Sequence, residues 1–177
     1  MNKFLSLLAC AALCAPVAAQ KMGSTNTNAP TISQSIAAGE AKMSLNYTAI
    51  TWADGKTMTM IMDKEKGERA RTRVNNNAKG TPLASFSTSV DCKVGDLAVK
   101  AGEYQVFFTI NAELAWEINF AQGETVQTMK LPLTDSQDES KRLVLAFYAM
   151  DNGAGIYVAF GKKMGEIPVS VAAPEKK

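Results

Sequence analysis

Two stretches in the middle of the chain, residues 104–110 and 116–120, alternate apolar and polar side chains with a period of two. Their apolar members are Tyr104, Val106, Phe108 and Ile110 in the first stretch and Trp116, Ile118 and Phe120 in the second. Successive side chains of a strand point to opposite faces, so this pattern predicts two strands that each bury one face. The intervening residues 111–115 are few enough for a hairpin loop. The chain should therefore be built on antiparallel hairpins.

Short segments of the same kind recur along the chain. We expect further strands at 44–50, 56–62, 83–90, 125–131, 142–150, 156–160 and 167–171. The segment 142–150 is apolar on both faces, which predicts a central strand covered on two sides. No stretch keeps a helical period over twelve residues, and the mixed charges of 63–71 predict a solvated loop or a short exposed helix. About nine short strands favour an all-β fold, an antiparallel β-sandwich or jelly-roll-like barrel.

The start of the chain has the pattern of a secretory signal peptide. Lys3 precedes an apolar run over residues 4–17, and Val17, Ala18 and Ala19 form a small-residue cleavage signature. The run is too short to span a bilayer, so we expect no integral membrane segment after cleavage. Cys10 sits in a loose imitation of a lipid-attachment motif, but the apolar run before it is short. We therefore expect export to the periplasm or the outside medium without a lipid anchor.

Composition predicts the boundaries of the folded unit. Residues 20–42 are rich in small and polar side chains and predict a flexible leader, and residues 172–177 predict a disordered tail. The expected domain therefore covers residues 43–171 after a signal peptide at 1–19. A chain of this size can bury a substantial core without cross-links.

The most decisive chemical feature is that the 177 residues include no histidine. Serine–histidine–aspartate and cysteine–histidine catalysis and imidazole metal sites are thereby excluded. Once the signal peptide is removed, Cys92 is the one remaining cysteine, and we expect a small buried thiol. The net charge is +2 and basic residues are dispersed among acidic ones, which does not indicate nucleic-acid binding. We predict no catalytic residue of these classes, no metal site and no cofactor.

Carboxylates leave one enzymatic alternative open. Two of them at the right separation can hydrolyse glycosidic bonds without histidine. The candidates are Asp54, Glu103, Glu113, Glu117 and Glu124, and nothing in the sequence selects a pair among them. Residues 135–139 could be imagined as a calcium loop, but they lack the glycine-centred ligand spacing, so we interpret them as a solvated connection.

The most unusual polar cluster is the run of three arginines and three asparagines between residues 69 and 77. Guanidinium and amide groups offer directional hydrogen bonds to a carboxylate, a phosphate or a sugar, so Arg71, Arg73 and Asn75 are candidate ligand-binding residues. The alternative is a polar loop without a ligand. Trp52, beside a predicted turn, is a candidate for an exposed platform that stacks on a sugar. Trp116 lies on the apolar stripe and is expected in the core.

The segment "KVGDLAVKAGEYQVFFTINAELAWEINFAQ", residues 93–122, resembles the central signature of the bacterial domain of unknown function 2911. Ala101, Gly102, Tyr104 and Trp116 match that signature. The segments "SLNY" at 44–47 and "GIYVAFGKKMGEIPV" at 155–169 resemble the opening and closing strands of the same family. The Trp-Arg-x-Gly-Ala-Asn stretch usual in the family is replaced here by Arg71–Asn76, which would make the chain a divergent member. The resemblance implies an exported β-sandwich and no particular reaction.

These observations leave three hypotheses about function. The first is a non-enzymatic module that binds a small molecule, a glycan or an envelope protein through Trp52, Arg71, Arg73 and Asn75. The second is a carboxylate-dependent glycan hydrolase. The third is a structural or interaction domain, which would present an exposed apolar patch or an open sheet edge instead of a concave pocket.

Overall fold

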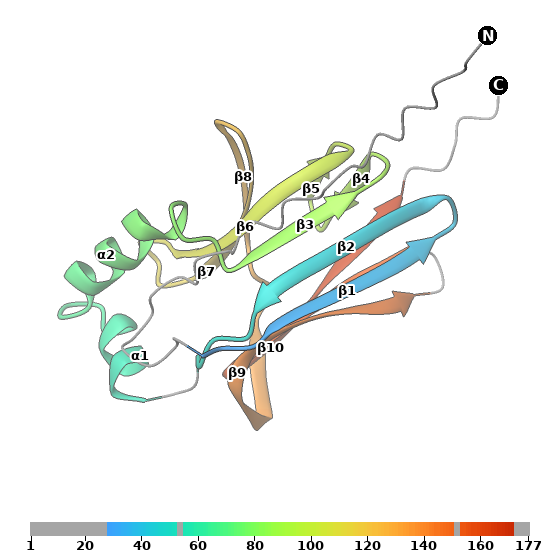
Figure 1. Cartoon of the computed structure of the whole chain (residues 1–177). Helices are drawn as coiled ribbons and strands as arrows, with labels where there is room; N and C mark the ends of the chain where they lie inside the picture. Colours follow the sequence, from blue (N-terminus) through green and yellow to red (C-terminus); the bar gives the residue numbers. More distant parts are fainter. Residues whose placement is uncertain (1–27, 53–54, 151–152, 172–177) are drawn as a thin grey trace, which may run out of the picture.

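Alternating side chains assemble the chain into two antiparallel sheets that face each other, with two helices at one end (Figure 1). The computed structural model describes residues 28–52, 55–150 and 153–171. The larger sheet has the order β1 (Thr31–Ala38), β2 (Ala41–Thr48), β3 (Ala84–Thr88), β6 (Gly102–Ile110), β7 (Trp116–Gln122) and β8 (Thr125–Lys130). The smaller sheet has the order β5 (Leu97–Val99), β4 (Cys92–Val94), β10 (Gly153–Val171) and β9 (Thr134–Met150). The prediction of an all-β antiparallel sandwich is confirmed.

The core lies between the sheets and is built from the apolar side of each strand. In the β6–β7 hairpin, Val106 pairs with Phe120 and Phe108 with Ile118, and all four side chains are buried. Each such burial contributes on the order of 1.5–3 kcal/mol to folding. The loop 111–115 closes the hairpin with a backbone hydrogen bond from Asn111 N–H to the Ala115 carbonyl of 3.0 Å. The hairpin predicted from period-two alternation is therefore present.

The expected flexible leader is wrong for its second half. Residues 31–38 form β1, which pairs with β2 along its whole length from Thr31↔Thr48 to Ala38↔Ala41. Ile32 and Ile36 lie on its half-buried side and pack against the core. Alternate residues of the segment face the core. The backbone pairing with β2 therefore stabilises a strand even though the segment contains few large apolar residues. The predicted signal peptide, residues 20–27 of the leader, and the predicted tail lie outside the described residues.

The predicted strand at 56–62 is also wrong, because α1 (Lys56–Ile61) occupies this segment. Met58, Ile61 and Met62 pack against the core, which is the i, i+3, i+4 spacing of a helix. The alternation of threonine and methionine along this segment imitates a strand pattern. A turn then leads into α2 (Glu68–Ala78), so of the two alternatives for the mixed-charge segment, the short helix is the closer.

The smaller sheet differs from expectation at its edge. The β9 strand begins at Thr134, so residues 135–139, expected as a solvated connection, belong to a long strand. Residues 142–150 lie in the edge strand of this sheet, not in a central one. The Gln34 side chain covers the edge, since its amide nitrogen Nε2 donates to the Leu145 carbonyl at 2.8 Å and its Oε1 accepts from Phe147 N–H at 2.9 Å.

Residues 49–52 cover the earlier part of the β9 edge. Leu143 N–H donates to the Ile50 carbonyl at 2.9 Å, and Trp52 N–H donates to the Lys141 carbonyl at 3.3 Å. Together with Gln34, this segment closes one side of the sandwich by joining the edges of the two sheets.

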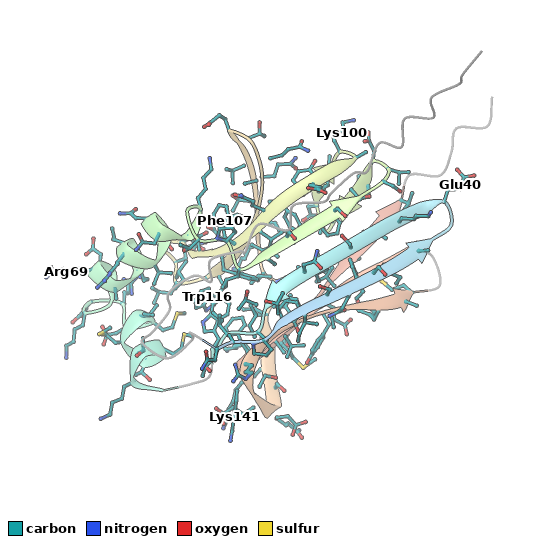
Figure 2. All side chains as sticks on the ribbon, in the orientation of Figure 1. Glu40, Arg69, Lys100, Phe107, Trp116 and Lys141 are labelled. Carbon is teal, nitrogen blue, oxygen red and sulfur yellow. The ribbon has the colours of Figure 1, made fainter. Side chains whose placement is uncertain are left out.

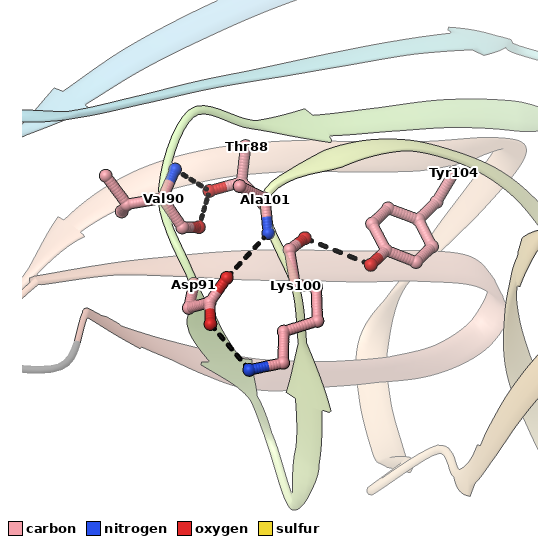
Figure 3. A network of polar contacts seen from close by, with 6 residues as sticks. All are labelled: Thr88, Val90, Asp91, Lys100, Ala101 and Tyr104. Carbon is pink, nitrogen blue, oxygen red and sulfur yellow. Dashed lines mark hydrogen bonds and ion pairs between the residues drawn. The ribbon is translucent and has the colours of Figure 1, made fainter.

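A polar corner positions the chain where it passes between the sheets on the way into β6 (Figure 3). The Tyr104 hydroxyl donates to the Lys100 carbonyl at 3.0 Å, four residues upstream. Asp91 accepts from Ala101 N–H at 2.9 Å and from Lys100 Nζ at 2.7 Å. Gly102 lies between these contacts with a φ of 144°, a conformation that favours glycine. The corner therefore explains why the segment has the order Ala-Gly-x-Tyr.

Tyr104→Phe should lower the free energy of unfolding by about 1 kcal/mol, because it removes one hydrogen bond of a buried hydroxyl and leaves the ring in place. Tyr157→Phe is the matched control, since Tyr157 is only half-buried on β10, and its effect should stay within about 0.5 kcal/mol. Urea unfolding of both variants measures the difference. Equal effects would show that the Tyr104 hydroxyl does not hold the corner.

The Asp91 contacts also predict a pH dependence. The hydrogen bond from Lys100, followed by that from Ala101 N–H, holds the pKa of Asp91 below its ordinary value of 3.8. A carboxyl whose pKa is lower in the folded state stabilises the fold above the unfolded value and loses this effect as the pH falls through the folded value. Asp91→Asn should therefore be less stable than the parent near pH 6, and the difference should shrink as the pH falls below the ordinary value of 3.8. A difference that stays constant over this range would contradict the assignment.

Candidate binding surfaces

The Arg71 guanidinium holds the connection between α1 and α2. Its Nη1 donates to the carbonyls of Ile61 at 2.7 Å and Asp63 at 2.5 Å, and its Nη2 donates to the Lys64 carbonyl at 3.0 Å. These carbonyls lie at the C-terminal end of α1 and just beyond it, where a helix leaves acceptors unsatisfied. Gly67 lets the guanidinium approach, since a Cβ there would lie 2.5 Å from Nη1. Arg71 is thus occupied by the chain's own backbone.

Asn75 is occupied in the same way. Its Nδ2 donates to the Ile110 carbonyl at 2.8 Å, and its Oδ1 accepts from Ile110 N–H at 2.9 Å. The two bonds tie α2 to the end of β6 as an extra strand residue would. Below this tie, Ala78 of the helix packs on Phe107 and Ala121, on the outer face of the larger sheet. The side chain predicted to contact a ligand instead anchors the helix.

Trp52 is buried, with 2% of its surface exposed, so the prediction of an exposed sugar platform is wrong. Its ring stacks on Phe160 with a centroid distance of 4.5 Å and meets Trp116 and Phe108 edge-on at 4.9 and 5.2 Å. The buried indole N–H has no hydrogen-bond acceptor among the described residues. The tertiary fold turns residues 49–52 inward along β9, and this carries the indole into the core.

Arg73 lies on the exposed side of α2. Positions 71 and 75 share a helix face, whereas position 73 is rotated by about 200° from position 71 and faces the other way. Arg73 lines a shallow, open depression of about 540 Å³ whose other residues are Glu68, Arg69, Thr72, Asn76 and Asn77. Figure 2 shows Arg69 at the outer side of the helical end and Trp116 between that end and the strands. The four predicted ligand residues therefore do not converge on one site.

A polar cluster that the sequence reasoning missed lies on the outer face of β6, β7 and β8. Asn119, with 4% of its surface exposed, donates to Thr109 Oγ1 at 3.0 Å and accepts from Thr128 Oγ1 at 2.6 Å. Glu117 accepts from Thr109 at 3.1 Å and from Asn111 at 3.2 Å. The sequence signal that could have found this cluster is the set of polar residues that alternate with the apolar ones on these strands. The cluster stiffens the three strands and leaves Thr128 at the surface.

Two of the candidate carboxylates, Glu103 and Glu117, lie far apart on the larger sheet. Glu103 lies near the start of β6. Glu117 lies on β7, opposite Thr109 near the end of β6. The six residues of strand between them correspond to roughly 20 Å, twice the largest separation that glycoside hydrolysis uses. Two depressions on the helical end contain one carboxylate each, Glu68 and Asp63, and neither was a candidate. Asp54 lies outside the described residues. Within the described ranges, no group of three acidic or cysteine side chains could hold a metal ion.

Cys92 is buried in β4, as expected. Burial raises the pKa of its thiol, with a smaller opposing effect from a hydrogen bond to Thr88. A thiol with a raised pKa is less nucleophilic at neutral pH, so the structure gives Cys92 the place of a small core residue.

In the described part of the chain, β8 forms one end of the larger sheet. Leu131 N–H donates to the Trp116 carbonyl at 2.8 Å, which fixes the odd-numbered residues of this ladder as those that bond to β7. The even-numbered residues Val126, Thr128 and Lys130 therefore direct their N–H and C=O groups away from β7. Among the described residues, no strand lies beyond β8 in the sheet order, and the β8 ribbon projects from the sandwich near the helical end (Figure 1).

Comparisons with known proteins give no further constraint: no family model, no curated protein and no solved structure matches the chain. In the part of the chain that the structure describes, no helix has the length and apolar character needed to cross a membrane.

Arg71→Met should lower the free energy of unfolding by about 2–3 kcal/mol, because it strips a charged donor from three backbone carbonyls and keeps the aliphatic stem. Arg73→Met, two residues along the same helix, should change it by less than about 0.5 kcal/mol. Chemical unfolding of the two variants compares them directly. Similar losses would mean that the helix tolerates neither change and that the clamp assignment is wrong.

Proposed function

We propose that this protein is a non-enzymatic module of the bacterial periplasm or cell envelope that binds a protein partner along the open edge of β8. The observation that carries the proposal is the row of outward N–H and C=O groups at Val126, Thr128 and Lys130. An added strand would satisfy these groups by extending the sheet, a mode in which main-chain hydrogen bonds supply affinity.

The β8 edge lacks most of the features by which sheet edges avoid pairing. The strand runs six residues in continuous register with β7, without a bulge or a proline, and carries one charge, Lys130, at its end. Val126, with 39% of its surface exposed, is among the exposed large apolar side chains of the described residues. The edge of β9, by contrast, is covered by Gln34 and residues 49–52. An open edge of this kind supports a role in association.

The placement of the predicted ligand residues favours a protein partner over a small ligand. Arg71 and Asn75 bond to backbone groups of the same chain, and Trp52 is buried. Arg73 lines only an open depression along one helix. A drug-sized or sugar ligand is usually held in a concave site that removes most of its surface from water.

Export and family membership are further parts of the proposal. The pattern of residues 1–19 supports export, and the resemblance to the domain of unknown function 2911 supports an exported sandwich. In the structure, Gly102 and Tyr104 of the matching segment both serve the corner into β6. The φ of 144° at residue 102 is strained for any other residue, so the glycine of the motif has a conformational reason. This role is consistent with a shared fold and assigns no activity.

A photo-crosslinking amino acid placed at position 126 tests the proposal in cells that make the full chain. A partner strand beside β8 would lie within about 5 Å of this side chain, so illumination should give a discrete crosslinked species. The same amino acid at position 93, exposed on β4 in the other sheet, is the matched control and should give none. No product from position 126, or equal products from both positions, would overturn the proposal.

A further inference from the structure

We infer that the occupant of the β8 edge is a second copy of this chain, paired antiparallel with its own β8 about a two-fold axis at Gln127. The inference rests on the proposed function and adds the identity of the partner. It follows from the register that the strand geometry allows and from the charges at the two ends of the strand.

Only a few registers join two copies into one continuous sheet. Residues directly opposite each other in an antiparallel pair point to the same face of the sheet. The outer faces of both copies therefore align only if the two-fold axis passes between the two copies of the same residue. An axis at Gln127 places Val126 opposite Thr128 and Thr125 opposite Met129. It also places Glu124, in the hairpin turn, opposite Lys130.

The ends of β8 are complementary in charge in this register alone. With the axis at Gln127, each Glu124 faces the Lys130 of the other copy, so the pair occurs twice. An axis one residue earlier places Glu124 opposite Thr128, and an axis one residue later places Lys130 opposite Val126. Opposite charges facing each other across a strand pair stabilise it, and like charges destabilise it.

Both charged side chains are accessible for this pairing. The Glu124 side chain is fully exposed, and its ion pair with Lys79 Nζ spans 4.0 Å, longer than the ion pairs of Asp91 and Asp135 at 2.7 and 2.5 Å. Lys130 is exposed on β8 and lies opposite Glu117 of β7. The two side chains do not come within the 4.0 Å of a salt bridge. Gly123, with a φ of 59°, makes the tight turn that brings Glu124 to the start of the edge.

The backbone fits the same register. Val126 and Thr128 both direct their N–H and C=O groups to the free edge, so facing residues of this kind exchange two hydrogen bonds. The two-fold axis repeats the Val126–Thr128 pair, which gives four backbone hydrogen bonds between the copies. The pairing also covers the exposed Val126 side chain with Thr128 of the other copy. Two six-stranded sheets would then form one sheet across the dimer.

Charge reversal tests the partner and the register together. Glu124→Lys or Lys130→Glu places like charges at both ends of the proposed interface, and each should weaken self-association at least about tenfold. Mixing the two variants in equal amounts should restore association, because each lysine then faces a glutamate. Sedimentation velocity of the full chain over a range of concentrations measures all three samples. Lys93→Glu, exposed on β4, is the control and should associate as the parent does.

A backbone test complements the charge test. Val126→Pro removes an N–H that faces the free edge and no N–H that bonds to β7, so it should abolish self-association while the fold is kept. The thermal unfolding midpoint of every variant checks the fold, since Lys130→Glu also faces Glu117 within the same chain. A parent chain that stays monomeric at every concentration overturns the inference. So does a dimer that survives Val126→Pro or both charge reversals, because it uses another surface.

The crosslinking and sedimentation results together distinguish a failure of the second-copy inference from a failure of the proposed binding function. A crosslinked species from position 126 with twice the mass of the chain supports both. A crosslinked species of another mass, together with a monomeric parent, supports the binding module and refutes the second copy. The absence of any species from position 126 overturns the binding module itself.

Discussion

The burial of alternate apolar side chains between the two sheets is the interaction on which the rest of the structure depends. Its centre at the helical end is Trp52, stacked on Phe160 and surrounded by Phe108 and Trp116 from the β6–β7 hairpin. Residues 49–52 reach this cluster only by running along β9, and this path joins the two sheets at one side. The chain enters α1 shortly after Trp52, so the place of Trp52 in the core determines at which end of the sandwich the helices lie.

The polar residues around this core hold the chain to itself. Arg71 binds the carbonyls between α1 and α2, Asn75 joins α2 to β6, and Gln34 joins β1 to β9. Each contact satisfies backbone groups that a packed edge or helix end would otherwise leave unpaired, which would cost stability. Side chains with the chemistry of ligand recognition are used here for internal hydrogen bonds, and this explains why they do not gather at a pocket.

The two sides of the sandwich differ in whether the edge strand is covered. One side is closed by Gln34 and residues 49–52, whereas β8 on the other side of the larger sheet keeps a row of free backbone groups. The polar cluster of Asn119 and Thr128 makes this edge rigid, since it ties β8 to β7 through side chains as well as the backbone. A rigid, unprotected edge is suited to strand addition, because little order is lost on binding.

The sequence by itself determined the fold class, the β6–β7 hairpin and the exclusion of histidine-based chemistry. Alternation with a period of two involves neighbours in the chain, and composition involves no geometry, so both can be read locally. Tertiary structure alone decided that residues 56–62 form a helix, that Trp52 is buried, and that β8 remains open. These outcomes depend on partners far along the chain, such as Gln34 with Leu145 at a separation of 111 residues. Local patterns do not contain that information, because which edge is covered is settled only when distant strands meet.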